Sequence, residues 1–297
     1  TPGNRGFYCS WQSASQQVAV VFTSLLGLAL VFWVPGDKKA FWEWRIALGI
    51  GCLIIPIILW LRRSLEETEA FKRMHRHPRK SSDVLRILGT NWQVVVVGVM
   101  LSVMTTTSFY LITAYTPTFA AQALHLSRTE NFLVTLCVGA SNFIWLPIGG
   151  TLSDRVGRRP ILLIIPALAI VTAYPVMLWM VAAPTMLRLL LVGLWFSMFF
   201  GLYSGAMIPF LTEIMPPEVR TAGFSVAFSL AAAVFGGFTP AVCTFLIKLT
   251  GNKASPALWL SLAAVIGLTG ALLSRRWGAE ENAERNFAPE AASATKP

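Results

Sequence analysis

Long apolar runs separated by short polar stretches make up most of this chain. A helix that crosses a bilayer needs about 20 mostly apolar residues, and eight runs approach or exceed that length: Ser13–Val34, Ile46–Leu61, Trp92–Tyr115, Phe132–Leu152, Ile161–Val181, Leu187–Leu211, Phe224–Leu249 and Ala257–Leu273. Several runs contain proline, which membrane helices tolerate where neighbouring groups satisfy the freed backbone carbonyls. The pattern predicts an all-α polytopic membrane protein with eight membrane-spanning helices.

The composition supports this interpretation. The 297 residues are 55% hydrophobic and 13% charged, and the mean hydropathy is +0.62, whereas soluble proteins carry roughly 25% charged residues. So few charges cannot solvate the outside of a water-soluble fold of this size. A soluble enzyme, a disordered regulator and a nucleic-acid-binding module are therefore excluded, and the lipid bilayer is the expected environment.

The net charge of +10 follows from an uneven distribution of lysine and arginine among the connecting segments. With eight spans, both chain ends lie on one side of the membrane, and most of the 24 Lys and Arg residues fall in the segments on that side. Because basic segments remain cytoplasmic, we expect both chain ends in the cytoplasm. The charge therefore needs no nucleic-acid partner to explain it.

Two segments outside the spans have a distinct composition. Residues 62–91 are predicted to form a basic cytoplasmic loop, either simply solvated or in contact with anionic lipid headgroups. Residues 276–297 are rich in Ala, Glu and Asn, and we expect a disordered cytoplasmic tail. The four cysteines are expected to be buried free thiols, and neither they nor the three histidines have the spacing of a metal site.

One connecting segment is more specific than a plain basic loop. Residues 150–160 read Gly-Thr-Leu-Ser-Asp-Arg-Val-Gly-Arg-Arg-Pro, and we expect a short polar turn here between two adjacent antiparallel helices. Gly150 allows close helix approach, Gly157 allows a tight reversal, and Asp154 can face the positive N-terminus of a neighbouring helix. Three arginines can pair with carboxylates or helix C-termini: Arg155, Arg158 and Arg159.

This segment resembles the cytoplasmic loop signature of the major facilitator superfamily, in the copy between the eighth and ninth spans of a twelve-span member. Residues 213–223 resemble that superfamily's loop between spans ten and eleven, and residues 61–71 resemble the stretch after span six. Three further segments are similar to the metabolite:proton symporters, and within these to bacterial citrate–proton symporters and their tricarballylate-transporting relatives: residues 5–17, 104–118 and 235–240.

The resemblance implies a major facilitator fold of which this chain holds eight of the usual twelve helices. Residues 1–61 would be the last two helices of the N-terminal half, and residues 92–275 the C-terminal six-helix half, joined by the loop over residues 62–91. The proton gradient, rather than a cofactor, would drive transport. The resemblance also implies a charge network that holds the cytoplasmic side closed, formed by Asp154, Arg158, Glu213 and Arg220.

A tricarboxylate needs strong hydrogen-bond donors or cations at mid-membrane depth, where charges are costly enough to mark function. None of the eight runs carries a charge at mid-depth, so the candidate substrate-binding residues are uncharged. They are a glutamine pair and a hydroxyl-rich face, each at helical spacing, and two further polar residues: Gln12 and Gln16; Thr106, Tyr110 and Thr113; Asn142 and Tyr203. Interhelical hydrogen bonding is the alternative role for each of them.

The resulting hypothesis is a symporter that imports citrate or a related tricarboxylate with protons across the bacterial inner membrane, by alternating access. Tricarballylate, other di- and tricarboxylates, and zwitterions such as betaine or proline remain alternative substrates. A truncated, non-transporting membrane subunit also remains open. A membrane-embedded enzyme is excluded because no cluster of His, Asp, Glu or Cys falls at membrane depth. We expect a monomer without bound metal.

Overall fold

The computed structural model describes residues 4–33, 39–64, 86, 89–215 and 219–277, and its regular structure is helical throughout these ranges. Most of the predicted central loop and nearly all of the predicted tail lie outside the described residues. The principal helices, with two π-helical segments η2 and η4, are α1 Arg5–Trp33, α2 Lys39–Cys52, α3 Ile54–Ser64, α6 Trp92–Phe109, η2 Tyr110–Tyr115, α7 Thr116–Gln122, α8 Arg128–Val156, α9 Arg158–Ala182, α10 Met186–Ile214, α11 Arg220–Ala231, η4 Ala232–Gly236, α12 Thr239–Thr250 and α13 Pro256–Arg276.

Eight helical stretches in the described residues are long and apolar enough to cross a membrane, which confirms the number predicted from the sequence. Three of these stretches combine shorter elements. α2 and α3 together form the second, α6 continues through η2 into α7, and α11 continues through η4 into α12. The π-helical segments therefore lie inside spans, where such bulges frequently mark functional sites.

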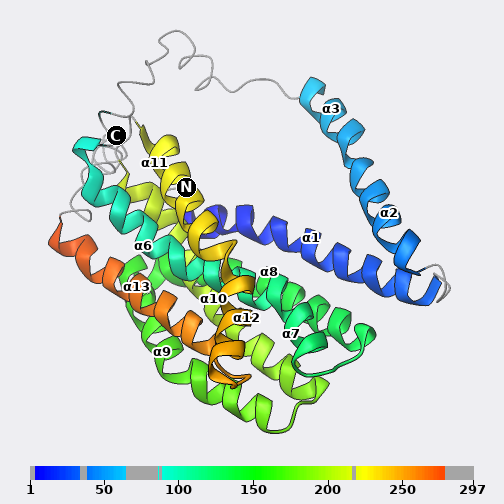
Figure 1. The fold of residues 1–297 in the computed structure, drawn as a ribbon. Helices are drawn as coiled ribbons and strands as arrows, with labels where there is room; N and C mark the ends of the chain where they lie inside the picture. The colour runs from blue at the N-terminus through cyan, green and yellow to red at the C-terminus, as the bar shows by residue number, and fades with distance from the viewer. Residues whose placement is uncertain (1–3, 34–38, 65–85, 87–88, 216–218, 278–297) are drawn as a thin grey trace.

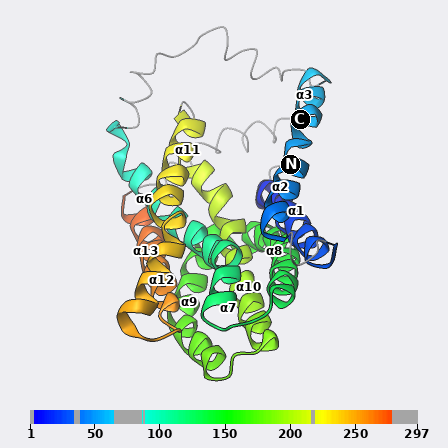
Figure 2. The ribbon, with the colours of Figure 1, turned by 45° about the vertical axis from the view of Figure 1, so that its right-hand side comes forward.

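The helices from α6 onward form a bundle, against which α1 packs along α8 (Figure 1). α8 makes its most extensive contacts with α1 and α10, while α13 packs on α6 and α9. Figure 2 shows the same bundle from another side, with α1 beside α8 at the right and with α12 and α13 at the left. α8 is thus flanked by α1 on one side and α10 on the other.

Glycines allow α8 to lie unusually close to both neighbours. A Cβ atom built on Gly150 would overlap the carbonyl oxygen of Gly6 in α1. A Cβ on Gly205 of α10 would lie 2.5 Å from the amide nitrogen of Gly150, and one on Gly149 would lie 2.6 Å from the carbonyl oxygen of Gly201. Small residues at helix contacts are typical of membrane bundles, where close van der Waals packing stabilises association.

α8 has well-defined ends. At its start, the Ser127 hydroxyl accepts a hydrogen bond from the Glu130 amide, and the Glu130 carboxylate accepts one from the Ser127 amide, forming a capping box. At its end, Gly157 adopts φ 94°, a conformation that favours glycine. The predicted reversal at Gly157 is confirmed, but the expected polar turn is wrong, because helix continues to Val156 and resumes at Arg158.

The cysteine prediction was only partly right. Cys243 is buried and Cys9 is half-buried, but Cys52 and Cys137 are exposed on the outside of the protein. All four are free thiols. An apolar run in a membrane protein can face lipid as readily as protein, so its apolar character does not predict burial within the fold.

The crowding at Gly150 generates a stability prediction. The Gly150→Ala variant should lose about 1–3 kcal/mol, a typical cost of overpacking, because the added methyl group meets the Gly6 backbone and the Ser10 hydroxyl of α1. Gly49→Ala in α2 is the matched control, since nothing lies within 4 Å of a Cβ there. Thermal unfolding of purified protein in detergent measures both, and equal midpoints for the two variants would contradict the packing described.

Candidate functional site

A cluster of charged residues lies where the C-terminal end of α8 meets the N-terminus of α1. The Asp154 carboxylate accepts hydrogen bonds from the backbone amides of Gly6 and Phe7, at 2.8 and 2.9 Å. These amides belong to the first turn of α1, which has no intrahelical partners for them and carries a partial positive charge. Asp154 thus faces a neighbouring helix N-terminus, the position predicted for it from the sequence.

Arg158 extends this arrangement to α10. Its guanidinium lies 2.5 Å from an Asp154 oxygen and 3.2 Å from Glu213 Oε1, and it donates to the Ser153 hydroxyl at 2.7 Å. The side chains of Asp154, Arg158 and Glu213, hereafter the charge cluster, are 6%, 15% and 16% exposed. Charge-assisted hydrogen bonds of low exposure are the stronger kind, so the charge cluster joins α1, α8, α9 and α10 at one end of the bundle.

The remaining members of the predicted loop motif lie around this cluster. Arg155 is exposed in the last turn of α8, and Arg159 is half-buried in the first turn of α9. Arg220, predicted as part of the network, is half-buried at the start of α11. The charge cluster itself is defined by the two ion pairs of Arg158, one with Asp154 and one with Glu213.

A second polar group lies midway along α8. The fully buried Asn142 donates to the Gln17 side-chain oxygen of α1 at 3.0 Å and accepts from the Ser197 hydroxyl of α10 at 2.7 Å. Ser197 also lies 2.8 Å from the hydroxyl of Ser141. Asn142, a predicted substrate residue, therefore bridges three helices and has both ends of its amide satisfied.

The predicted hydroxyl-rich face divides into residues with different surroundings. The Thr106 hydroxyl is buried and donates to backbone carbonyls, nearest to that of Ser102 at 3.0 Å. Tyr110 begins η2 and lies against Gly236 of η4, where a Cβ would approach the ring to 2.8 Å. Thr113 is half-buried and lines a cavity of about 350 Å³ between α1, η2 and α8. Of the three residues on this face, Thr113 is the one that lines a described cavity.

The structure does not bring the other predicted residues to this site. Gln12 and Gln16 are exposed on α1, and it is Gln17 that is buried, 1% exposed. Tyr203 is fully buried, and its hydroxyl donates to the Leu101 carbonyl at 3.0 Å. Tyr203 therefore holds α10 against α6.

The importance of Gln17 could have been found from a different pattern. The buried positions of α1 are mostly small residues at helical spacing, and Gln17 falls in the same stripe: Gly6, Ser10, Ala14, Gln17 and Ser24. A stripe of small residues marks a helix contact in a membrane protein. A glutamine within it is directed at the neighbouring helix.

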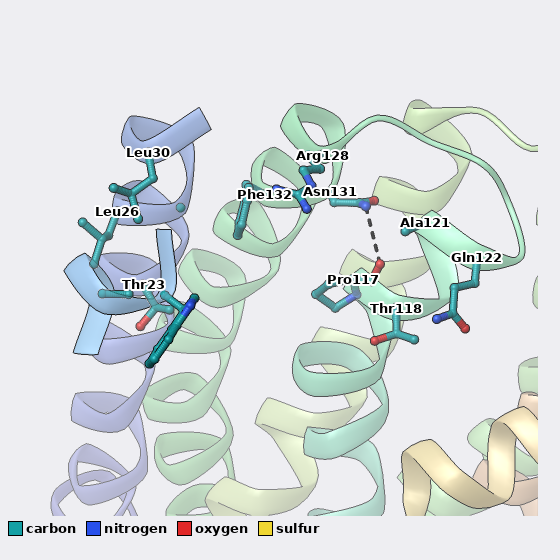
Figure 3. Close-up of a pocket in the computed structure, with 13 residues that line it drawn as sticks. Thr23, Leu26, Leu30, Pro117, Thr118, Ala121, Gln122, Arg128, Asn131 and Phe132 are labelled. Atoms are coloured by element: carbon teal, nitrogen blue, oxygen red, sulfur yellow. Dashed lines mark hydrogen bonds between the residues drawn. The ribbon is translucent and has the colours of Figure 1, made fainter. Parts of the chain in front are cut away.

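Two neighbouring cavities lie toward the other end of α8. The Thr113 cavity is lined also by three hydroxyl side chains, from Thr23, Ser24 and Thr135. A larger cavity of about 560 Å³, hereafter the Arg128 cavity, opens between α1, α2, α7 and the start of α8 (Figure 3). Both cavities share Thr23, Pro117 and Phe132, so they are adjacent. No cluster of three or more His, Cys, Asp or Glu side chains that could hold a metal occurs in the described part of the chain.

The described residues thus form a bundle of long apolar helices, joined by a charge cluster at one end and hollowed toward the other, as expected of a polytopic membrane protein. Residues 1–240 match the family model described as Major Facilitator Superfamily, and the chain belongs to that family.

Two relatives are 53% identical to this chain, and both are named citrate-proton symporter. The protein from Salmonella typhi matches over 287 residues, 95% of this chain and 66% of its own length. The protein from Klebsiella pneumoniae matches over 268 residues, 90% and 60% respectively. A glycine betaine/proline/ectoine/pipecolic acid transporter from Dickeya dadantii is 26% identical over 284 residues, 91% of this chain and 56% of its own length. The chain thus spans about two thirds or less of the length of these curated relatives.

The buried polar contact between α1 and α8 yields a second prediction. Gln17→Leu removes the acceptor of the Asn142 amide and should destabilise the protein by about 1–3 kcal/mol, the usual cost of an unsatisfied buried polar group. Gln16→Leu makes the same chemical change one residue away on an exposed position. Thermal unfolding in detergent should separate the two variants, and an unchanged midpoint for Gln17→Leu would contradict the proposed contact.

Proposed function

We propose that this chain is part of a proton-coupled symporter that imports citrate or a closely related tricarboxylate by alternating access. The observation that carries this proposal is the 53% identity, over nearly the whole chain, to two citrate-proton symporters. The relatives named for betaine and proline are 26–27% identical, which ranks zwitterions below carboxylates as substrates. Tricarballylate remains an alternative tricarboxylate.

The position of the charge cluster supports a gating role. α8 has 29 residues, which at 1.5 Å per residue is about 43 Å, and the cluster and the Arg128 cavity lie at opposite ends of it. The cluster ties α1, in the N-terminal half of the proposed transporter, to α8, α9 and α10 in the other half. The bundle is therefore closed at the charged end and hollowed toward the opposite end.

Alternating access then requires the cluster to break. For the charged end to open, the α1 amides must separate from Asp154, and Glu213 must separate from Arg158. These charge-assisted contacts favour the state in which the charged end is closed. We propose that this end faces the cytoplasm of the bacterial inner membrane, in agreement with the excess of lysine and arginine in the segments on that side. Both chain ends would then be cytoplasmic, and the working unit a monomer without a cofactor.

The Thr113 cavity is the proposed route for substrate within this chain. Its polar lining consists of hydroxyl groups, which can donate hydrogen bonds to a carboxylate. Several of these hydroxyls already bond to the preceding helical turn, as Thr23 does to Ala19 and Ser24 to Val20. They can rotate toward a ligand at small cost, so they orient a carboxylate without neutralising its charge.

Uptake measurements test the proposed function. Proteoliposomes containing this chain joined to the unmatched part of the Salmonella typhi relative should accumulate radiolabelled citrate when an inward proton gradient is imposed. The gradient is necessary because the proposed mechanism couples citrate entry to protons, so a proton ionophore should abolish accumulation. Uptake of tricarballylate instead of citrate would correct the substrate, and uptake of neither would overturn the symporter proposal. The 297-residue chain alone, assayed in parallel, shows whether it suffices for transport.

The gating role generates a separate prediction. Asp154→Asn keeps the shape of the side chain but removes the charge that caps α1 and pairs with Arg158, and it should slow initial citrate uptake by about tenfold, corresponding to ~1.4 kcal/mol. Citrate binding should persist, because the cluster lies away from both cavities. Thr151→Val is the control, since that hydroxyl donates within its own helix to the Pro147 carbonyl. An unchanged initial rate for Asp154→Asn would refute the gating role.

A further inference from the structure

The Arg128 cavity has the character of a small-molecule binding site. Ligand cavities typically measure about 300–1,000 Å³ and are mostly apolar, with a few polar groups that converge on the ligand. This cavity has a volume of about 560 Å³ and a largely apolar wall that includes Leu26, Leu30 and Trp44. Its polar groups come mainly from α7 and the start of α8, as Figure 3 shows: Thr118, Gln122, Arg128 and Asn131.

Among the described residues that line this cavity, Arg128 is the single charged one. It is exposed and occupies the first position of α8, where the helix dipole favours an anion and disfavours a cation. The Ser127–Glu130 capping box stabilises this helix end instead, with the Glu130 carboxylate 2.7 Å from the Ser127 hydroxyl. An anion bound in the cavity would offset the unfavourable interaction between the Arg128 charge and the helix dipole.

Asn131 supplies a second, independent observation. It is 5% exposed and lines the same cavity, and its amide group donates to the Pro117 carbonyl at 3.4 Å. Its side-chain oxygen is buried without a hydrogen-bond partner in the described part of the chain. A buried acceptor left unpaired costs free energy, so this oxygen favours a ligand or water that brings a hydroxyl donor.

The Arg128 cavity is also adjacent to the proposed substrate route. Phe132 lines both this cavity and the Thr113 cavity, and Thr23 and Pro117 do so as well. The Phe132 ring lies directly against α1, at Gly27, where no side chain larger than hydrogen fits. The Phe132 ring thus lies at the boundary between the two cavities.

We propose that the Arg128 cavity is an outer binding site for a hydroxylated polycarboxylate, which is held there before it passes Phe132 to the Thr113 cavity. Arg128 binds an ionised carboxylate of the ligand, and the Asn131 oxygen accepts a hydrogen bond from its hydroxyl group. This inference rests on the proposed function and deepens it. A site built to bond a hydroxyl group discriminates against an analogue that lacks one, so citrate binds here in preference to tricarballylate.

Protection of a cysteine in the cavity tests this proposal without requiring transport. In the 297-residue chain with its four native cysteines replaced by serine, Thr118→Cys places a thiol on an exposed position of the cavity wall. Reaction with N-ethylmaleimide, which is uncharged, should slow as citrate is added. Tricarballylate should need a concentration about tenfold higher for equal protection, as expected for loss of one hydrogen bond worth ~1.4 kcal/mol.

Two arginine variants distinguish citrate binding at a specific site from a general effect of surface charge. Arg128→Gln should raise the citrate concentration needed for half-protection by at least about tenfold, because it loses a charge-assisted contact. Arg188→Gln is the control, since Arg188 also lies near a helix start but is half-buried, bonds to the Trp179 carbonyl and does not line the cavity. Arg128→Lys should restore part of the protection.

The outcomes also show whether the proposed binding site or the proposed symport function has failed. Absence of protection by citrate, or equal protection in Arg128→Gln and Arg188→Gln, would overturn the binding site even if citrate uptake is observed. Protection that depends on Arg128 in a protein without citrate uptake would retain the site and overturn the symporter proposal. Equal protection by citrate and tricarballylate would refute the role of Asn131.

Discussion

The close approach of three helices at Gly150 is the constraint on which the charged end of this structure depends. The backbone of α1 reaches α8 there from one side and that of α10 from the other, and neither approach leaves room for a side chain. Asp154 lies one turn further along the same face of α8, so this contact places its carboxylate within hydrogen-bond distance of the first amides of α1. Arg158 and Glu213 then complete the cluster across α9 and α10.

The same helix relates this cluster to the cavities. α1 and α8 touch at backbone level near Gly6 and Gly150, are joined by Gln17 and Asn142 halfway along, and further on line the walls of two cavities. Contacts between them thus change from backbone contacts near Gly6 and Gly150 to side-chain contacts further along, where the Phe132 ring lies against Gly27.

Polar residues within the bundle either hold helices together or lie at cavities where a ligand could bind. The residue type alone does not show which of these roles a residue has. Thr106, Asn142 and Tyr203 bond to backbone or to neighbouring helices, so they hold the bundle together. Thr113 and Asn131 lie at cavities, and the side-chain oxygen of Asn131 lacks a partner within the described residues. Asn131 thus differs from the structural residues by its unpaired oxygen, which is costly in a membrane, whereas Thr113, which donates to the Phe109 carbonyl, differs by its position at a cavity.

The sequence by itself determined the number of spans, the reversal at Gly157 and the orientation of Asp154 toward a helix N-terminus. These depend on local quantities: the length of an apolar run, the backbone freedom of glycine, and the charge at a helix end. The tertiary structure decided that Gln17 rather than Gln12 or Gln16 is buried, and that Arg128 lines a cavity. Lipid and protein interior are equally apolar, so hydrophobic periodicity does not reveal which face of a membrane helix meets a neighbour; that depends on how the helices pack.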